Sequence, residues 1–160
     1  MLDKLTTCVW FDFGQARAAA EFYATTFPDS HVDAVHDAPS DYPGGSAGTE
    51  HTVEFTVLGR SFLGLNGGPL FVPNESVSFM VLTDDQAETD RYWRAIVDNG
   101  GEESACGWCK DRWGFSWQIT PKALLAAVYS SDVAAAKRAM DAMMDMVKID
   151  IAAIERAARG

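Results

Sequence analysis

Short apolar runs alternate with longer amphipathic segments along the first 120 residues, and this order occurs twice. Residues 7–11 form an apolar run typical of a β-strand, and residues 15–27 place apolar side chains at helical spacing. Residues 78–82 form a second strand-like run, and a second amphipathic helix begins at Gln86. Because a shift of 71 residues aligns Gln15 with Gln86 and the first strand with the second, the pattern predicts an internal repeat.

Each predicted helix is followed by short strand-like segments separated by turn residues, the pattern of an antiparallel sheet. These segments cover residues 31–36, 51–57 and 61–66 in the first half, and 102–109 and 114–120 in the second half. The last strands also match, because Arg60 to Asn66 aligns with Arg112 to Gln118. Only two strand segments are recognised after the second helix, but the repeat predicts two similar βαβββ modules, residues 5–70 and residues 76–120.

The last 40 residues have a different composition, rich in Ala, Met and charged residues. Asp132 and Asp150 are candidate N-caps of two helices. The apolar side chains at helical spacing after Asp132 are Ala136, Met140, Met143 and Val147. We expect an all-helical appendage over residues 121–160, which packs on its own sheet or, as an alternative, on a dimer partner.

Composition and charge narrow the possible functions. A chain of 160 residues with 48% apolar content has the size and the core of one domain. A formal charge of −10 disfavours binding to nucleic acid, which requires clustered Lys and Arg. The N-terminal residues do not resemble a signal peptide, and no apolar run is long enough to span a membrane. We expect a cytoplasmic protein without a membrane partner.

Three cysteines do not form the even set of a secreted disulfide framework, so reduced thiols are expected. Cys106 and Cys109 have the C-x-x-C spacing of redox and zinc motifs, but no second pair follows. Two cysteines flanking a glycine turn in a hairpin are therefore favoured over a redox or zinc site.

Several segments in order resemble one known family. These segments are Trp10–Asp12, Ala20–Tyr23, Phe27–Ser30, Leu65–Pro69, Asp90–Trp93, Cys106–Trp108, Gly114–Ile119 and Asp150–Ala153. They are similar to the PhnB-like branch of the glyoxalase, bleomycin-resistance and dioxygenase superfamily, also called vicinal oxygen chelate. The resemblance implies a single α+β glyoxalase-like domain over residues 1–160, with paired modules forming a curved mixed sheet around a small-molecule cavity. It also implies a homodimer.

This branch often carries the label 3-demethylubiquinone-9 3-methyltransferase, which the residues do not support. A Rossmann-type methyltransferase needs a Gly-rich turn between a strand and a helix near its N-terminus. The sequence has no such turn, since Gly44-Gly45 and Gly67-Gly68 are not followed by a predicted helix. No cofactor is predicted.

The metal-ligand positions of the superfamily, transferred through the repeat alignment, fall on four neutral residues. These residues are Thr7, Asn66, Ser78 and Gln118. Hydroxyl and amide groups bind divalent metals weakly compared with imidazole and carboxylate. We therefore expect no tightly bound metal at these positions and expect the four side chains to line the cavity.

Strand alternation gives a separate prediction of which residues face the cavity. It places Thr7, Ser78 and Gln118 on the cavity side, and Glu54 with them, because Val53, Phe55 and Val57 would pack under the helix. Glu54 is the candidate general base, and the alternative is a solvated carboxylate or an ion pair with Arg60 or Arg112. Phe11 and Phe62 are expected to line the cavity, and Trp108 to stack on a flat or apolar ligand at its edge.

Three functions remain open from the sequence. The first is a module that binds a small molecule without chemistry, which the neutral ligand positions favour. The second is a metal-independent enzyme that uses Glu54. The third is a metal-dependent lyase, isomerase or dioxygenase whose ligands would be found among His31, His36, His51 and Glu54.

Overall fold

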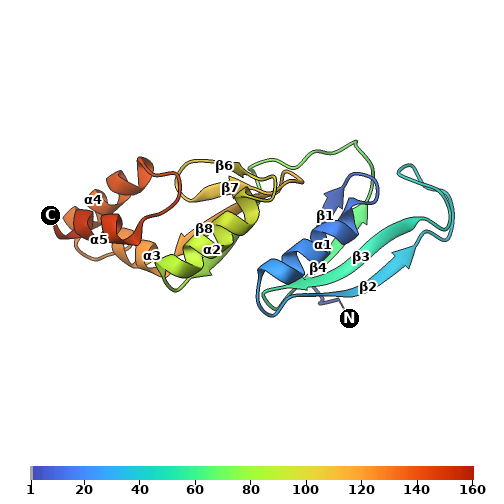
Figure 1. Ribbon diagram of the computed structural model, residues 1–160, viewed down its shortest axis with the longest axis horizontal. Coiled ribbons are helices and arrows are strands. Elements are labelled where there is room, and N and C mark those ends of the chain that lie inside the picture. The colour runs from blue at the N-terminus through green and yellow to red at the C-terminus, as the bar shows by residue number, and fades with distance from the viewer. Residues whose placement is uncertain (1) are drawn as a thin grey trace. The chain divides into compact units, whose positions relative to one another are not determined.

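The computed structural model describes residues 2–160 and contains two compact units, Met1–Pro73 and Asn74–Gly160. Each unit has a four-stranded mixed sheet with a helix packed on one face (Figure 1). These elements confirm the predicted α+β class.

The first unit is a βαβββ module. It consists of β1 (Thr7–Phe11), α1 (Gln15–Thr26), β2 (His31–Asp37), β3 (Glu50–Val57) and β4 (Arg60–Asn66). The strand order is β1-β4-β3-β2, in which β1 and β4 are parallel and the other pairs antiparallel. Val53, Phe55 and Val57 are buried on the face of β3 that packs against α1, as the alternation predicts.

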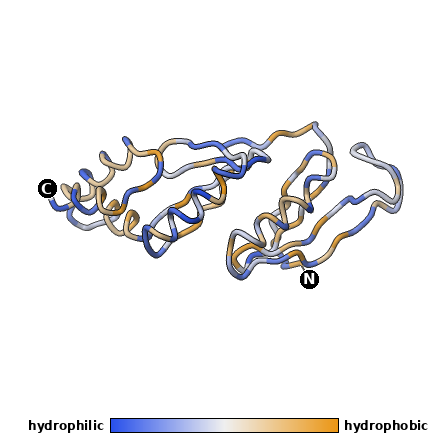
Figure 2. The backbone as a smooth tube through the Cα atoms, viewed as in Figure 1, coloured by the Kyte–Doolittle hydropathy of each residue, from blue (hydrophilic) through white to orange (hydrophobic). Residues whose placement is uncertain are grey.

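The second unit repeats this topology. It contains β5 (Ser78–Thr83), α2 (Gln86–Val97), β6 (Glu102–Glu103), β7 (Trp108–Lys110) and β8 (Ser116–Pro121), in the order β5-β8-β7-β6. Figure 2 shows apolar residues interrupted by polar ones along α2. The buried side chains of this helix include Tyr92, Trp93 and Ile96, which pack on the sheet.

The strand predicted at residues 102–109 is divided into β6 and β7 by a tight turn. Cys106 and Gly107 both have positive φ angles, 58° and 80°, which a β-strand cannot accommodate. Glycine adopts this region freely, but cysteine seldom does. The glycine turn expected between Cys106 and Cys109 is therefore present, but the sequence did not indicate that Cys106 itself would adopt this conformation.

The C-terminal helices α3 (Lys122–Val128), α4 (Val133–Met144) and α5 (Ile151–Arg159) belong to the second unit. Asp132 and Asp150 cap α4 and α5 through their side chains, which confirms both predicted caps. The helices share a small core of Leu124, Ala139, Ile149 and Ile154. Within residues 2–160, no helix combines the length and the apolarity needed to cross a lipid bilayer.

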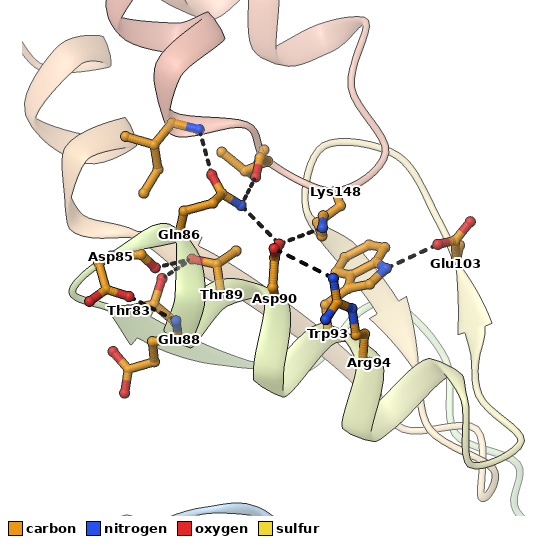
Figure 3. A network of polar contacts seen from close by, with 12 residues as sticks. Thr83, Asp85, Gln86, Glu88, Thr89, Asp90, Trp93, Arg94, Glu103 and Lys148 are labelled. Atoms are coloured by element: carbon orange, nitrogen blue, oxygen red, sulfur yellow. Dashed lines mark hydrogen bonds and ion pairs between the residues drawn. The ribbon is translucent and has the colours of Figure 1, made fainter.

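Polar contacts hold the segment between α4 and α5 against the start of α2 (Figure 3). The Gln86 amide donates to the Ile149 carbonyl at 3.1 Å and accepts from the Ile151 amide at 2.9 Å. Lys148 forms an ion pair with Asp90 on the same helix. The C-terminal segment is thus anchored to the module, with its backbone polar groups paired.

Candidate functional site

The first sheet places four predicted cavity residues on the face that packs against α1. Thr7 pairs with Phe62 across β1 and β4, and Phe11 pairs with Asn66, so all four side chains share one face. This face meets α1, because a Cβ atom built on Gly64 between them would lie 3.0 Å from the Ala16 Cβ atom. Phe11, Phe62 and Asn66 are buried, with exposed fractions of 2%, 8% and 1%.

These positions correct the predicted facing of β1 and β4. Three residues, 12–14, connect β1 to α1, whereas two residues, 84–85, connect β5 to α2. The shift of 71 residues that aligns the helices therefore misaligns β1 and β5 by one residue. Strand β4 presents Phe62 and Asn66 to the same face as Thr7 and Phe11, because it pairs with β1 in parallel register. A one-residue slip sends every side chain of a strand to the opposite face.

The buried side chain of Asn66 connects three segments of the first unit through hydrogen bonds. Helix α1 begins after Gly14, which has no side chain to cap it. The Asn66 Oδ1 atom accepts from the Ala16 amide at 2.9 Å, and its Nδ2 atom donates to the carbonyl and the carboxylate of Glu50, both at 3.2 Å. Asn66 thus supplies the missing cap from another strand.

Glu54 lies on the open face of the first sheet, as predicted. Its Oε1 atom is 3.0 Å from the Nε2 atom of His36 on the neighbouring strand β2. His36 was not among the expected partners, Arg60 and Arg112. This contact could not be predicted from the sequence, because the pairing of β2 with β3 includes an irregularity between Val32 and Ala34.

The three histidines do not converge on one point. His31 pairs with Asp33 at 3.1 Å, and the ring of His51 lies 4.3 Å from that of Tyr42. Among residues 2–160, no group of three or more His, Cys, Asp or Glu side chains is arranged to hold a metal ion. The superfamily positions carry neutral side chains, and two of them, Thr7 and Asn66, face α1. These residues do not suit a divalent metal.

The second sheet follows the predicted alternation. Val81, Trp117 and Ile119 are buried against α2, and Ser78 and Gln118 lie on the opposite, open face. Gln118 has Met80 as its neighbour on β5 and Trp108 as its neighbour on β7. An indole, an amide and a thioether therefore stand in one row across three strands. The Gln118 amide donates to the Ser78 hydroxyl at 2.8 Å, and this hydrogen bond orients the Gln118 side chain.

A groove of about 510 Å³ lies between this open face and the C-terminal helices. Its lining residues are Met80, Cys106, Trp108, Gln118, Thr120, Leu124, Leu125, Val128, Tyr129, Val133, Ala136, Lys137, Met140 and Met143. Two predicted cavity residues, Trp108 and Gln118, thus meet in one site. The sequence predicted that the apolar face of Ala136, Met140 and Met143 packs on its own sheet or on a dimer partner. It did not predict that a groove separates this face from the sheet.

The helical wall is only partly covered by protein. Val133 is 79% exposed and Met140 is 45% exposed, so apolar surface of α4 remains in contact with water. The wall is held in place at its end, because the Cys106 and Gly107 amides each donate to the segment after α4, at 2.7 Å to the Met146 and Val147 carbonyls. An apolar face that is fixed yet uncovered favours binding of an apolar ligand.

The two cysteines of the C-x-x-C segment lie in different environments. Cys106 lines the groove, whereas Cys109 pairs with Trp117 in the sheet and is buried on the α2 face. Burial, with the nearby carboxylates of Asp111 and Glu103, raises the pKa of the Cys109 thiol to about 12. A thiol with this pKa is a poor nucleophile, which supports the hairpin interpretation over a redox motif.

Two βαβββ units with the same strand order define the glyoxalase-fold class, also called vicinal oxygen chelate proteins. Residues 3–120 match the family described as 3-demethylubiquinone-9 3-methyltransferase, so the chain belongs to this PhnB-like family. The expected resemblance is confirmed for the two modules. No functionally curated protein shows significant similarity to the chain.

Solved structures support the same fold. The PhnB protein from Bacillus cereus is 24% identical, with a TM-score of 0.65 over 74% of this chain and 99% of its own. Protein PA1353 from Pseudomonas aeruginosa is 17% identical, with a TM-score of 0.57 over 74% of this chain and 98% of its own.

The helical wall of the groove lies outside the matched region. The family match ends at residue 120, before α3 begins at Lys122. The similarity to the family expected at Asp150–Ala153 is therefore not part of this match. The groove combines a sheet face of the family fold with helices that the match does not include. The expected homodimer stays a prediction.

The methyl transfer named in the family description does not fit the residues present. A Rossmann-type cofactor site requires a parallel sheet and a Gly-rich turn before a helix. Each sheet here has a single parallel pair, and the turn before α2 consists of Asp84 and Asp85. The structure supports no chemical step through such a cofactor.

Proposed function

We propose that this protein binds a small molecule, without a bound metal or cofactor, in the groove between the second sheet and the C-terminal helices. The observation that carries the proposal is the meeting of Trp108, Gln118 and Met80 with the uncovered apolar face of α4 around one space of about 510 Å³. Small-molecule sites typically measure ~300–1,000 Å³ and combine an apolar lining with a few polar groups.

The lining favours binding over acid-base chemistry. Its polar side chains are those of Gln118, Thr120, Tyr129 and Lys137, with the thiol of Cys106. Among the described lining residues, none is His, Asp or Glu, the side chains that most often act as general acids or bases. A protein that holds its ligand unchanged is consistent with this lining.

Two substitutions on opposite walls test the groove. N-phenyl-1-naphthylamine, an uncharged aromatic probe, is expected to bind at one site per chain, measured by its fluorescence in titration. Trp108→Ala removes the flat surface on the sheet side, and Ala136→Trp fills the groove from the helix side. Each change is expected to weaken binding by about tenfold or more, since central aromatic contacts contribute over ~1 kcal/mol to binding.

The control is Trp113→Ala, which removes an indole of the same unit outside the groove. It is expected to leave the dissociation constant within about twofold of the wild-type value. Circular dichroism shows whether each variant is folded. If folded Trp108→Ala and Ala136→Trp proteins both bind the probe as the wild type does, the groove is not the binding site.

The contact between His36 and Glu54 favours a second candidate function, a metal-independent enzyme with its base on the first sheet. The carboxylate and the imidazole lie 3.0 Å apart on an open face, an arrangement that suits proton transfer. If this function holds, the wild-type protein consumes a metabolite from a cell extract that Glu54→Gln leaves intact, as followed by mass spectrometry. Equal consumption by both proteins argues against it.

A further inference from the structure

The groove has an electrostatic character that differs from the rest of the chain. The protein carries a formal charge of −10, yet the one charged side chain in the described lining is that of Lys137. A cationic ligand in the groove would lose part of its hydration, and no carboxylate of the described lining would compensate for this loss. An anion of suitable shape would meet an ammonium group instead.

Lys137 is able to turn toward a ligand. Its Nζ atom lies 2.5 Å from the Asp141 carboxylate one turn further along α4, and the two side chains are 74% and 61% exposed. Exposed pairs of this kind contribute little to stability, because water solvates both charges. A ligand anion therefore competes with Asp141 for the ammonium at small cost.

The apolar lining suits a planar ring. Trp108 offers an aromatic face from β7, and three thioethers line the groove, from Met80 on β5 and from Met140 and Met143 on α4. Thioether sulfur makes favourable contacts with aromatic rings, and the flexible methionine side chain adapts to their edges. A flat aromatic ligand thus gains contacts from both walls.

We infer that the groove binds a planar aromatic molecule that carries one negative charge, with its ring between Trp108 on the sheet and Met140 and Met143 on α4, and its anionic group at Lys137. The inference rests on the proposed function, because it names the class of ligand for the same site. The amide of Gln118, oriented by Ser78, supplies hydrogen bonding at the sheet wall.

Two probes with the same aromatic skeleton distinguish the contribution of ring shape to binding from the contribution of charge. 1-Anilinonaphthalene-8-sulfonate is an anion, and N-phenyl-1-naphthylamine lacks the sulfonate. We expect the full-length protein to bind the anion more tightly than the neutral probe at low salt. Added salt is expected to weaken binding of the anion and to leave binding of the neutral probe unchanged. The Lys137→Gln variant is expected to bind the anion with a dissociation constant about three- to fivefold higher than the wild type. Its dissociation constant for the neutral probe is expected to change by less than about twofold.

Lys122→Gln is the matched control, because Lys122 also forms an exposed ion pair, with Asp84, but lies outside the groove. It is expected to change neither dissociation constant. Equal affinity for both probes, with no selective effect of Lys137→Gln, would overturn the inference and leave the groove as a binding site. Failure of both probes to bind would overturn the proposed function itself.

Discussion

Replacing Asp111 by alanine is expected to lower the free energy of unfolding by about 3–5 kcal/mol, the largest effect of any substitution considered. The Asp111 side chain lies in the turn between β7 and β8 and is 3% exposed. It accepts from the Trp113 amide at 2.9 Å, the Phe115 amide at 3.1 Å and the Trp117 indole at 2.9 Å. Alanine leaves the buried indole N–H without its acceptor.

Urea denaturation followed by tryptophan fluorescence measures this loss. Asp111→Asn keeps an acceptor at the same position and is expected to cost less than the alanine variant. Asp145→Ala, at an exposed position, is expected to change stability by less than about 0.5 kcal/mol. A loss below about 1 kcal/mol for Asp111→Ala would show that this carboxylate does not organise the turn.

Replacing Asn66 by leucine is expected to lower the free energy of unfolding by about 2–4 kcal/mol. Leucine has a similar size, so the effect comes from lost hydrogen bonds rather than from a cavity. The variant leaves the Ala16 amide at the start of α1 without the acceptor that now lies at 2.9 Å. Thermal unfolding by circular dichroism gives the change in stability.

Asn99→Leu makes the same chemical change at an exposed helix end and is expected to alter stability by less than about 0.5 kcal/mol. If Asn66→Leu is as stable as this control, Asn66 is not the cap of α1. A loss of ligand binding with unchanged stability would instead restore Asn66 to the cavity where the sequence placed it.

The sequence predicted most of the fold because periodicity and turn residues are local signals. The repeat of two modules, the burial of Val53, Phe55 and Val57, and the caps Asp132 and Asp150 all followed from such signals. The face to which each side chain of β1 points could not be predicted in this way, because it depends on one extra residue in the connection to α1. Sequence similarity within a repeat aligns helices and strands only when their connections have equal length.

Only the sheet side of the candidate site could be predicted from the sequence. Alternation along β8 identified Gln118 and its open face, because that argument needs only the strand itself. The spacing of Met140 and Met143 showed that α4 has an apolar face, but amphipathicity does not tell which surface a helix faces. The groove depends on that choice, so only the structure reveals it.

The two units consequently have different roles in the protein. Phe11, Phe62 and Asn66 stabilise the first unit from within, whereas Trp108 and Gln118 of the second unit remain at an open face. The C-terminal helices turn that open face into a groove with a second wall.

The methionine methyl groups provide the most direct test of the ligand groove, through carbon-13 NMR of the labelled protein. Of the six methionines, Met80, Met140 and Met143 line the groove, and Met146 lies on the segment that follows α4, outside the lining. On saturation with N-phenyl-1-naphthylamine, the signals of the three lining methionines are expected to shift, while that of Met146 stays in place. Unchanged signals from Met80, Met140 and Met143 in the presence of bound probe would contradict binding in this groove.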